Sequence, residues 1–215
     1  MLERPSTEDG QWGGRLHLID GPELSVQARA LSDQLHEAAV PFAERAGFAG
    51  TTEDAKLIGL WNVQLHRPDH AEGFNRWVLA DQQGSSLSPR MREIVMLAVG
   101  VVWEADWVIY SHVAAARTAG LSESMIVSLL DGRTDGEFDD DEAVAHAFAD
   151  GLARRHTVSD EIYHDAVRLL GQDGVLDLTQ LVSVYVATAA QLNAFRVPAP
   201  PVEPPVNATP RTRDA

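Results

Sequence analysis

The chain has 215 residues, of which 45% are hydrophobic and 7% aromatic, and its formal net charge at pH 7 is -15. This charge argues against non-specific nucleic-acid binding, which needs a basic surface, and any site for an acidic ligand must supply its own positive field. The sequence contains no cysteine, which excludes disulfides, thiolate metal sites and thiol catalysis. A chain of this length can form one sizeable core.

Neither a secretory signal nor a membrane span is expected. The first 14 residues lack the apolar region of a signal peptide. The longest apolar run, residues 94–103, is shorter than the roughly 20 residues that cross a bilayer. We therefore expect a cytoplasmic protein without a membrane partner.

The N-terminal quarter is predicted to contain an arm and two helices. Residues 1–22 are rich in Gly and also contain Pro, and are expected to form a loose arm. Apolar side chains at helical spacing predict a helix over 24–48, which Pro41 should kink or split. Thr52 is placed to cap a second helix over 53–66.

The next two predicted helices each begin with proline, which is favoured in the first helical turn. Pro68 begins a helix that runs to about Gln83 and has an apolar stripe. That stripe consists of Phe74, Trp77 and Val78. Ser88 caps a helix over 89–103 that is almost wholly apolar after its first turns, which predicts burial on all sides.

The second half of the chain is predicted to be helical as well, and no segment alternates as a strand does. The remaining predicted helices cover residues 106–119, 122–130, 141–155, 160–170 and 177–195. The predicted fold is therefore all-α, with one domain over residues 23–197. Residues 198–215 form a tail too rich in Pro to fold by itself.

Several short motifs occur in a characteristic order between about residues 55 and 197. They are His66-Arg67-Pro68, Leu87-Ser88-Pro89-Arg90-Met91-Arg92-Glu93, His112 with Ala114 to Ala116, Ala119-Gly120-Leu121-Ser122, Val158-Ser159-Asp160, and Tyr185 with Asn193. In this order the sequence resembles the carboxymuconolactone decarboxylase family of the alkylhydroperoxidase D-like superfamily. The resemblance implies an alkylhydroperoxidase D-like helical domain and homo-oligomers, often trimers or hexamers.

The resemblance also implies a proton relay between Glu93 and His112. The peroxidase branch of the superfamily has two cysteines at positions that are Ala105 and Val108 here, so its thiol chemistry is not available. The decarboxylase branch needs no cysteine, metal or organic cofactor. Its members often carry Glu-Trp at positions that are Val108 and Ile109 here, and this departure leaves the substrate open.

The residues themselves are compatible with acid–base chemistry. His112 shares a helix face with Ala105 and Val108, and a histidine with a pKa near 6.5 can accept or donate a proton at neutral pH. Glu93 could hold the imidazole in one tautomer. The alternative interpretation is structural, with His112 satisfying a buried helix end and Glu93 serving as an acid near a helix start.

Further side chains are candidates for substrate binding. Arg90 and Arg92 could each bind a carboxylate, and Trp107 and Tyr110 could form a pocket wall. We expect no metal site, because Pro68 separates the pair His66 and His70, the most suggestive histidines by spacing.

The sequence thus predicts a cofactor-free lyase that uses His112 and Glu93 on a small lactone or carboxylic acid. One alternative is another enzyme on the same scaffold, such as an isomerase or a non-thiol activity related to peroxidases. A second is a non-catalytic oligomeric binding protein. These classes differ in whether Glu93 and His112 meet within hydrogen-bond reach in a cavity.

Overall fold

The computed structural model describes residues 4–6, 12–135 and 137–200, and this part of the chain is built from helices without a named strand. The α-helices are α1 (Val26–Gln34), α2 (Val40–Ala46), α3 (Leu60–Leu65), α4 (Pro68–Gly84), α5 (Pro89–Val102), α6 (Asp106–Thr118), α7 (Glu123–Leu130), α8 (Asp140–Arg155) and α9 (Asp160–Ala194). A 3-10 turn, η1 (Gly21–Glu23), and a π turn, η2 (Leu35–Ala39), precede α2. The all-α prediction is confirmed.

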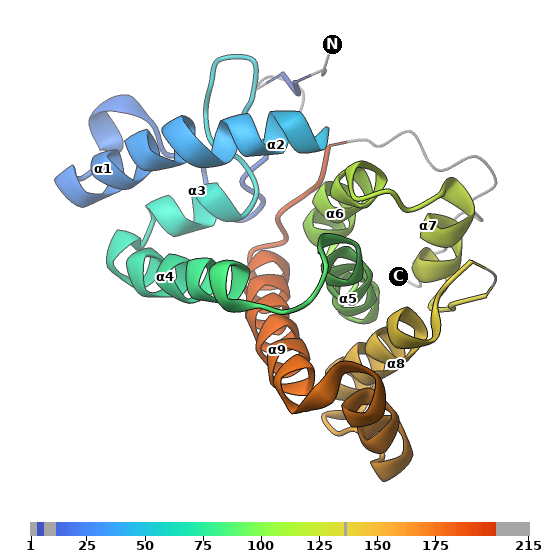
Figure 1. Cartoon of the computed structure of the whole chain (residues 1–215). Helices are drawn as coiled ribbons and strands as arrows, with labels where there is room; N and C mark the ends of the chain where they lie inside the picture. Colours follow the sequence, from blue (N-terminus) through green and yellow to red (C-terminus); the bar gives the residue numbers. More distant parts are fainter. Residues whose placement is uncertain (1–3, 7–11, 136, 201–215) are drawn as a thin grey trace.

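Helix α5 lies at the centre of the fold and packs against α6, α8 and α9. Its apolar sequence buries residues all along its length, from Met91 to Gly100. On the other side of α9, helices α1 to α4 form a separate layer, which contacts the rest through α2, α3 and α4 (Figure 1). The molecule therefore has a fully covered helix at its centre and a more open layer at its N-terminal side.

Local signals set the ends of α5 and α6 as the sequence predicts. The Ser88 side chain accepts a hydrogen bond from the Met91 backbone N–H at 3.1 Å, and Pro89 occupies the first turn. Helix α6 ends before Gly120, which adopts φ of 88°. The two helices approach closely, because a Cβ added at Gly100 would lie 2.9 Å from Val108.

The first predicted helix is interrupted, but before Pro41 rather than at it. Residues 35–39 form a wider π turn, in which the Val40 N–H reaches the Leu35 carbonyl. Proline has no N–H, and its ring would clash with the carbonyl four residues earlier, here that of Glu37. A widened turn at this point removes that clash.

The predicted helix over 53–66 is wrong for its first half. Helix α3 begins only at Leu60, and the Thr52 hydroxyl instead accepts from the Lys56 N–H at 3.0 Å, which closes a turn. Gly59 adopts φ of 66°, and a Cβ there would lie 2.0 Å from the Trp107 ring. The backbone leaves the helical conformation because Gly59 must pass over this indole.

The expected apolar stripe of α4 is also largely wrong. Ala71 is the buried residue of this helix, whereas Trp77 is 37% exposed and Phe74 and Val78 are only partly buried. Helix α4 lies at the edge of the molecule between α3 and α9, so one of its sides has no neighbour in the single chain (Figure 1).

The described part of the N-terminal arm is packed rather than loose. Trp12 is buried, and its indole N–H donates to the Ser6 carbonyl at 2.7 Å. The Arg15 N–H donates to the Phe195 carbonyl at 2.7 Å, which ties the arm to the end of α9. Residues 1–3 and 7–11 of the predicted arm, and 201–215 of the predicted tail, lie outside the described residues.

The last two predicted helices are continuous in α9 except for a kink at Gly171, where φ is 73°. By length and composition alone α9 could cross a membrane. In the fold it packs along α5 and α8 instead, as the core helix of a bundle does.

Candidate active site

Glu93 and His112 are brought together by the antiparallel packing of α5 and α6. The Oε2 atom of Glu93 lies 2.8 Å from Nδ1 of His112. The two side chains are only 14% and 16% exposed, respectively. Since burial strengthens the interaction between a carboxylate and an imidazole, this hydrogen bond fixes both side chains relative to each other.

This hydrogen bond defines which nitrogen of His112 is available for chemistry. A carboxylate can only accept, so Nδ1 carries the proton and donates it to Glu93. In the neutral imidazole the lone pair is then on Nε2, for which no hydrogen-bond partner is found among the described residues. The pair therefore presents Nε2 as a base, or as an acid once protonated.

Tyr185 of α9 packs against the imidazole of His112. Its ring stands edge-on to the His112 imidazole, with 4.9 Å between the ring centroids. Burial raises the pKa of Tyr185 well above its usual value, and the Glu93 carboxylate acts in the same direction. The phenol consequently remains protonated at physiological pH and can only donate or accept a hydrogen bond there.

An ion pair between Arg92 and Asp81 lies close enough to influence the same phenol. Nη2 of Arg92 is 2.6 Å from the Asp81 carboxylate, and the side chains are 13% and 4% exposed. Both charges act on the pKa of Tyr185, Arg92 lowering it and Asp81 raising it. Nη1 of Arg92 is buried without a hydrogen-bond partner.

We call this group the Glu93 cluster. It consists of Asp81, Arg92, Glu93, His112 and Tyr185. Three helices and the end of a fourth supply it, with α5 contributing two adjacent residues. It offers one imidazole nitrogen, one protonated phenol and one guanidinium nitrogen without a partner, a combination that can transfer a proton and donate hydrogen bonds.

Residues 68–150 match the model of the Carboxymuconolactone decarboxylase family. This segment includes Asp81, Arg92, Glu93 and His112, whereas Tyr185 lies beyond it. No curated protein matches the chain.

Two solved structures show the same fold. One is an Agrobacterium tumefaciens protein of unknown function, described as a candidate antioxidant defence protein AhpD; it is 15% identical, with a TM-score of 0.61, and the match covers 66% of this chain and 97% of that one. The other is a debrominase in complex with 2,3,4-tribromopyrrole; it is 12% identical, with a TM-score of 0.65, and the match covers 80% of this chain and 88% of that one. At these identities the likeness concerns the fold alone, which is the alkylhydroperoxidase D-like helical fold of the family.

The two arginines predicted as carboxylate anchors make different contacts. Arg90 forms an ion pair with buried Glu142 and donates to the Gly120 carbonyl at 2.8 Å, and the hydrogen bond to Glu142 raises the pKa of Arg90. These contacts of Arg90 join α5 to α8 and to the turn that follows α6. Arg92 alone reaches the Glu93 cluster.

The aromatic residues predicted to line a substrate pocket belong to the core instead. Trp107 and Tyr110 are 6% and 8% exposed, with 5.4 Å between their ring centroids. The Tyr110 hydroxyl accepts from the Ala49 N–H at 2.7 Å, and burial raises the pKa of this phenol. Both side chains point from α6 towards the N-terminal layer, because the chain at Gly59 and Ala49 packs over them.

Sequence reasoning missed Asp81 as a member of the cluster and gave Tyr185 no role. No local signal marks Asp81, which meets Arg92 only because α4 turns back towards α5. Tyr185 was visible as part of the family-like final helix, but its distance from His112 depends on how α9 packs.

A metal site has no support from the geometry. Among residues 4–6, 12–135 and 137–200, no group of three or more His, Asp or Glu side chains is placed to hold a metal ion. A pocket of about 620 Å³ in the described chain is lined by neither Glu93 nor His112. The cluster instead reaches solvent through the small exposed fractions of its own side chains.

Proposed function

We propose that the protein is a cofactor-free acid–base lyase of the carboxymuconolactone decarboxylase type, acting on a small lactone or carboxylic acid. The observation that carries this proposal is the 2.8 Å hydrogen bond from His112 Nδ1 to Glu93, which leaves Nε2 open beside a protonated Tyr185. The match of residues 68–150 to the family model supports it.

In the proposed reaction the bond between the substrate carbon and its carboxylate breaks, and carbon dioxide leaves. The electron pair moves through the conjugated alkene into the lactone carbonyl, which becomes a dienolate. Protonated His112 then delivers a proton from Nε2 to carbon, and the pair recovers its proton from solvent. Glu93 holds the imidazole and stabilises its protonated form.

Two neighbouring groups suit the other demands of this step. The Tyr185 hydroxyl can donate a hydrogen bond to the developing enolate oxygen, since its pKa is raised and the phenol is not ionised. The free Nη1 of Arg92 can orient the departing carboxylate. Both groups face a substrate only if it enters the Glu93 cluster beside His112.

The comparison with the debrominase bears on the type of chemistry. That protein was solved as a variant in which a cysteine is replaced by alanine, whereas this chain contains no cysteine. Proton transfer by His112 needs no thiol.

An isomerase that moves a proton without losing carbon dioxide would use the same cluster and is the second candidate.

A proton-exchange assay tests the proposal. Small unsaturated lactone carboxylates are incubated with the protein in D₂O, and carbon dioxide release and deuterium incorporation are followed by NMR. His112→Ala and Glu93→Gln should each lower turnover about 100-fold or more, because that is the usual scale of acid–base loss. The double variant should be little worse than the worse single one, since the two residues act as a unit.

An exposed histidine of α9 provides a control for the loss of an imidazole. His164→Ala removes an exposed histidine of α9 and should leave turnover unchanged. If His112→Ala and Glu93→Gln lower the melting temperature by several degrees while the folded fraction keeps its activity, the pair is structural. Incorporation of deuterium without release of carbon dioxide would favour the isomerase.

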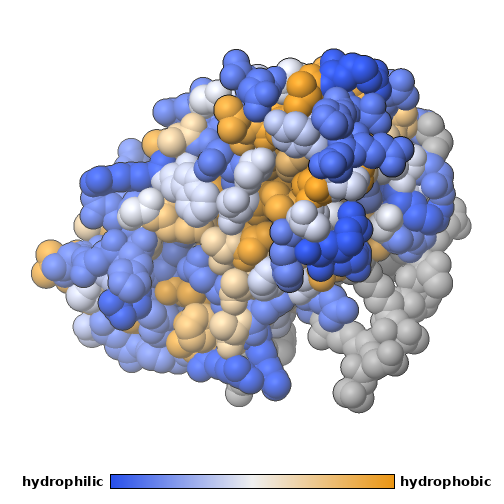
Figure 2. Space-filling view, turned by 90° about the horizontal axis from the view of Figure 1, so that it is seen from below, coloured by the Kyte–Doolittle hydropathy of each residue, from blue (hydrophilic) through white to orange (hydrophobic). Residues whose placement is uncertain are grey.

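We also propose that the protein is a homo-oligomer, a trimer or hexamer, in the cytoplasm. Apolar side chains remain exposed in the single chain, and Figure 2 shows hydrophobic patches between hydrophilic side chains on one face. The large exposed ones are Val26, Phe42, Trp77, Leu79, Tyr163 and Leu176. A multiple of the 23.4 kDa chain mass by light scattering is expected, and a monomer at micromolar concentration would contradict it.

A further inference from the structure

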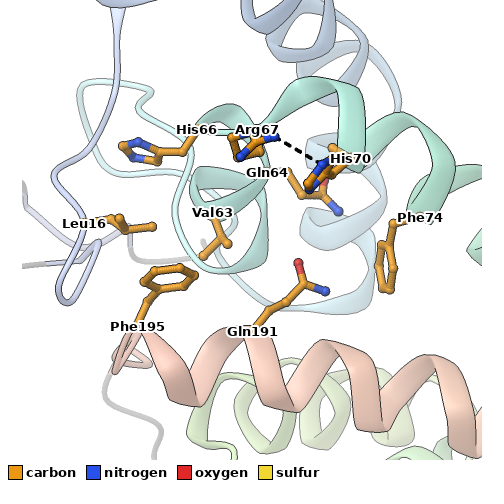
Figure 3. Close-up of a pocket in the computed structure, with 10 residues that line it drawn as sticks. Leu16, Val63, Gln64, His66, Arg67, His70, Phe74, Gln191 and Phe195 are labelled. Carbon is orange, nitrogen blue, oxygen red and sulfur yellow. Dashed lines mark hydrogen bonds between the residues drawn. The ribbon is translucent and has the colours of Figure 1, made fainter.

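A second feature of the molecule is a pocket whose lining contains no residue of the Glu93 cluster. This pocket of about 620 Å³ opens between α3, the first half of α4, the end of α9 and Leu16 of the arm (Figure 3). Its volume lies within the range of roughly 300–1,000 Å³ that is usual for small-molecule sites. Of the residues that line it, only His70, Ala71 and Phe74 fall within residues 68–150, so this pocket is largely built by parts of the chain outside the family match.

The pocket has apolar walls and a basic edge. Its apolar lining consists of Leu16, Val63, Ala71, Phe74 and Phe195, and its polar lining of Gln64, His66, Arg67, His70 and Gln191. None of these residues is acidic, although the chain has 32 Asp and Glu residues. Arg67 is therefore the positive group of this lining, in contrast to the net negative charge of the whole chain.

Arg67 has no carboxylate partner among the described residues. Its Nη2 donates to Nε2 of His70 at 3.2 Å, and no other partner of its guanidinium is found among the described residues. Arg76, two and a half turns further along the same region, is instead paired with Glu72. An arginine without a carboxylate partner keeps its charge and its bidentate geometry available for an anion.

The other polar side chains of the pocket are held in place by their own hydrogen bonds. Gln64 and Asn75 exchange two side-chain hydrogen bonds of 2.8 and 3.3 Å. His66 Nε2 donates to the His17 carbonyl at 3.1 Å, and Gln191 donates to the Ala187 carbonyl at 3.1 Å. The pocket is thus pre-formed, and a ligand need not order these groups on binding.

The rings of Phe74 and Phe195 stand on opposite sides of the space below Arg67 and His70 (Figure 3). We propose that this pocket binds a small carboxylate with a flat or cyclic apolar body, with the carboxylate at Arg67 and the body between the two phenylalanine rings. The lining of this pocket shares no residue with the Glu93 cluster, and the proposal goes beyond the proposed lyase function.

Calorimetric titration of the full chain with benzoate tests this inference, with benzamide as an uncharged ligand of the same shape. Benzoate should bind saturably, and benzamide at least about tenfold more weakly, because only benzoate offers an anion to Arg67. Arg67→Gln should weaken benzoate binding by a similar factor and abolish the preference. Phe74→Ala should weaken both ligands, since it removes one wall.

Matched controls separate this site from other positive groups. Arg45→Gln removes the same charge from an exposed position of α2 and should leave benzoate affinity unchanged. His112→Ala should also leave it unchanged, whatever that variant does to turnover. Circular dichroism and melting temperature verify the fold of each variant.

Three results would overturn the inference. The first is the absence of saturable benzoate binding up to about 10 mM, which is weaker than a site of this volume should give. The second is equal affinity for benzoate and benzamide. The third is a loss of binding in His112→Ala without a loss in either Arg67→Gln or Phe74→Ala, which would place the ligand in the Glu93 cluster.

Discussion

Helices α4 and α5 follow one another in the chain and both begin with proline, yet they differ strongly in how much of each is buried. Helix α5 buries eight of its 14 residues, whereas α4 buries only Ala71 of its 17. The central helix supplies Arg92 and Glu93 to a nearly closed cluster, while α4 supplies Phe74 and His70 to an open pocket. A proline in the first turn can therefore begin either a buried core helix or a partly exposed one. The number of elements that pack around the helix decides which it is.

This difference in burial changes how much an ion pair contributes to the stability of the fold. On the α5 side a charged group is removed from water and needs a partner, so ion pairs there are structural necessities. On the outer side of α4 charges remain solvated, and their pairs contribute little. The following predictions measure that contrast, from the largest expected effect to the smallest.

Two ion pairs formed by α4 residues give the sharpest test. Arg92–Asp81 is 13% and 4% exposed, whereas Arg76–Glu72 is 76% and 65% exposed. Asp81→Ala should lower the free energy of unfolding by about 3–5 kcal/mol, because it leaves the Arg92 charge buried and unpaired. Glu72→Ala should cost no more than about 0.5 kcal/mol. Urea denaturation measures both, and similar losses in the two variants would show that the inner pair is also hydrated.

Two glycines give a second contrast, of backbone and packing. Gly59→Ala should destabilise the protein by about 2–4 kcal/mol, since it combines a left-handed φ of 66° with a Cβ that would lie 2.0 Å from the Trp107 ring. Gly73→Ala in α4 meets nothing within 4 Å and should instead stabilise by about 0.5–1 kcal/mol. A stable Gly59→Ala protein in a thermal melt would mean that the 51–59 segment repacks easily.

The smallest expected effect concerns pH. His146 of α8 is 6% exposed, and burial lowers the pKa of His146 below its usual 6.5, an effect that nearby Asp150 opposes and Arg154 supports. The folded state therefore holds His146 neutral, while the unfolded state binds a proton below pH 6.5. Stability from this group is complete above pH 6.5 and falls as the pH drops towards the folded pKa, by at most about 1.4 kcal/mol per pH unit.

His146→Gln should flatten that part of the stability curve, as measured by urea denaturation between pH 5 and 7. The exposed His164, changed in the same way, should leave the slope as it is. An unchanged slope in His146→Gln would show that other groups set the acid sensitivity of the fold.

Much of the helical framework was determined by the sequence itself. Ser88, Ser122 and Ser159 cap α5, α7 and α9, each accepting a hydrogen bond from the backbone N–H three residues later, and Gly120 follows the end of α6 in a left-handed conformation. These signals act between residues three or four apart, so they operate before any tertiary contact forms. The all-α fold could be predicted on this basis. The contact between Glu93 and His112 was expected from the family resemblance, and the structure places the two side chains within hydrogen-bond distance.

What the sequence could not determine depends on which elements meet. It treated Arg90 and Arg92 alike, and only the positions of Glu142 and Asp81 give them separate tasks. It expected Trp107 in a pocket wall, but the passage of Gly59 over that ring places it in the core. Which side chains meet in these contacts depends on how segments that are distant in the sequence pack together.

The open pocket is the clearest case of a feature that tertiary structure decided. Its lining combines Leu16, Arg67 and Phe195, and Phe195 lies more than a hundred residues beyond the other two in the chain. The arm reaches this place because the Arg15 N–H binds the Phe195 carbonyl, a contact between two backbone groups that carries no side-chain signature. Contacts between segments so far apart in the chain leave no periodic pattern in the sequence. The pocket can therefore be recognised only in the folded chain.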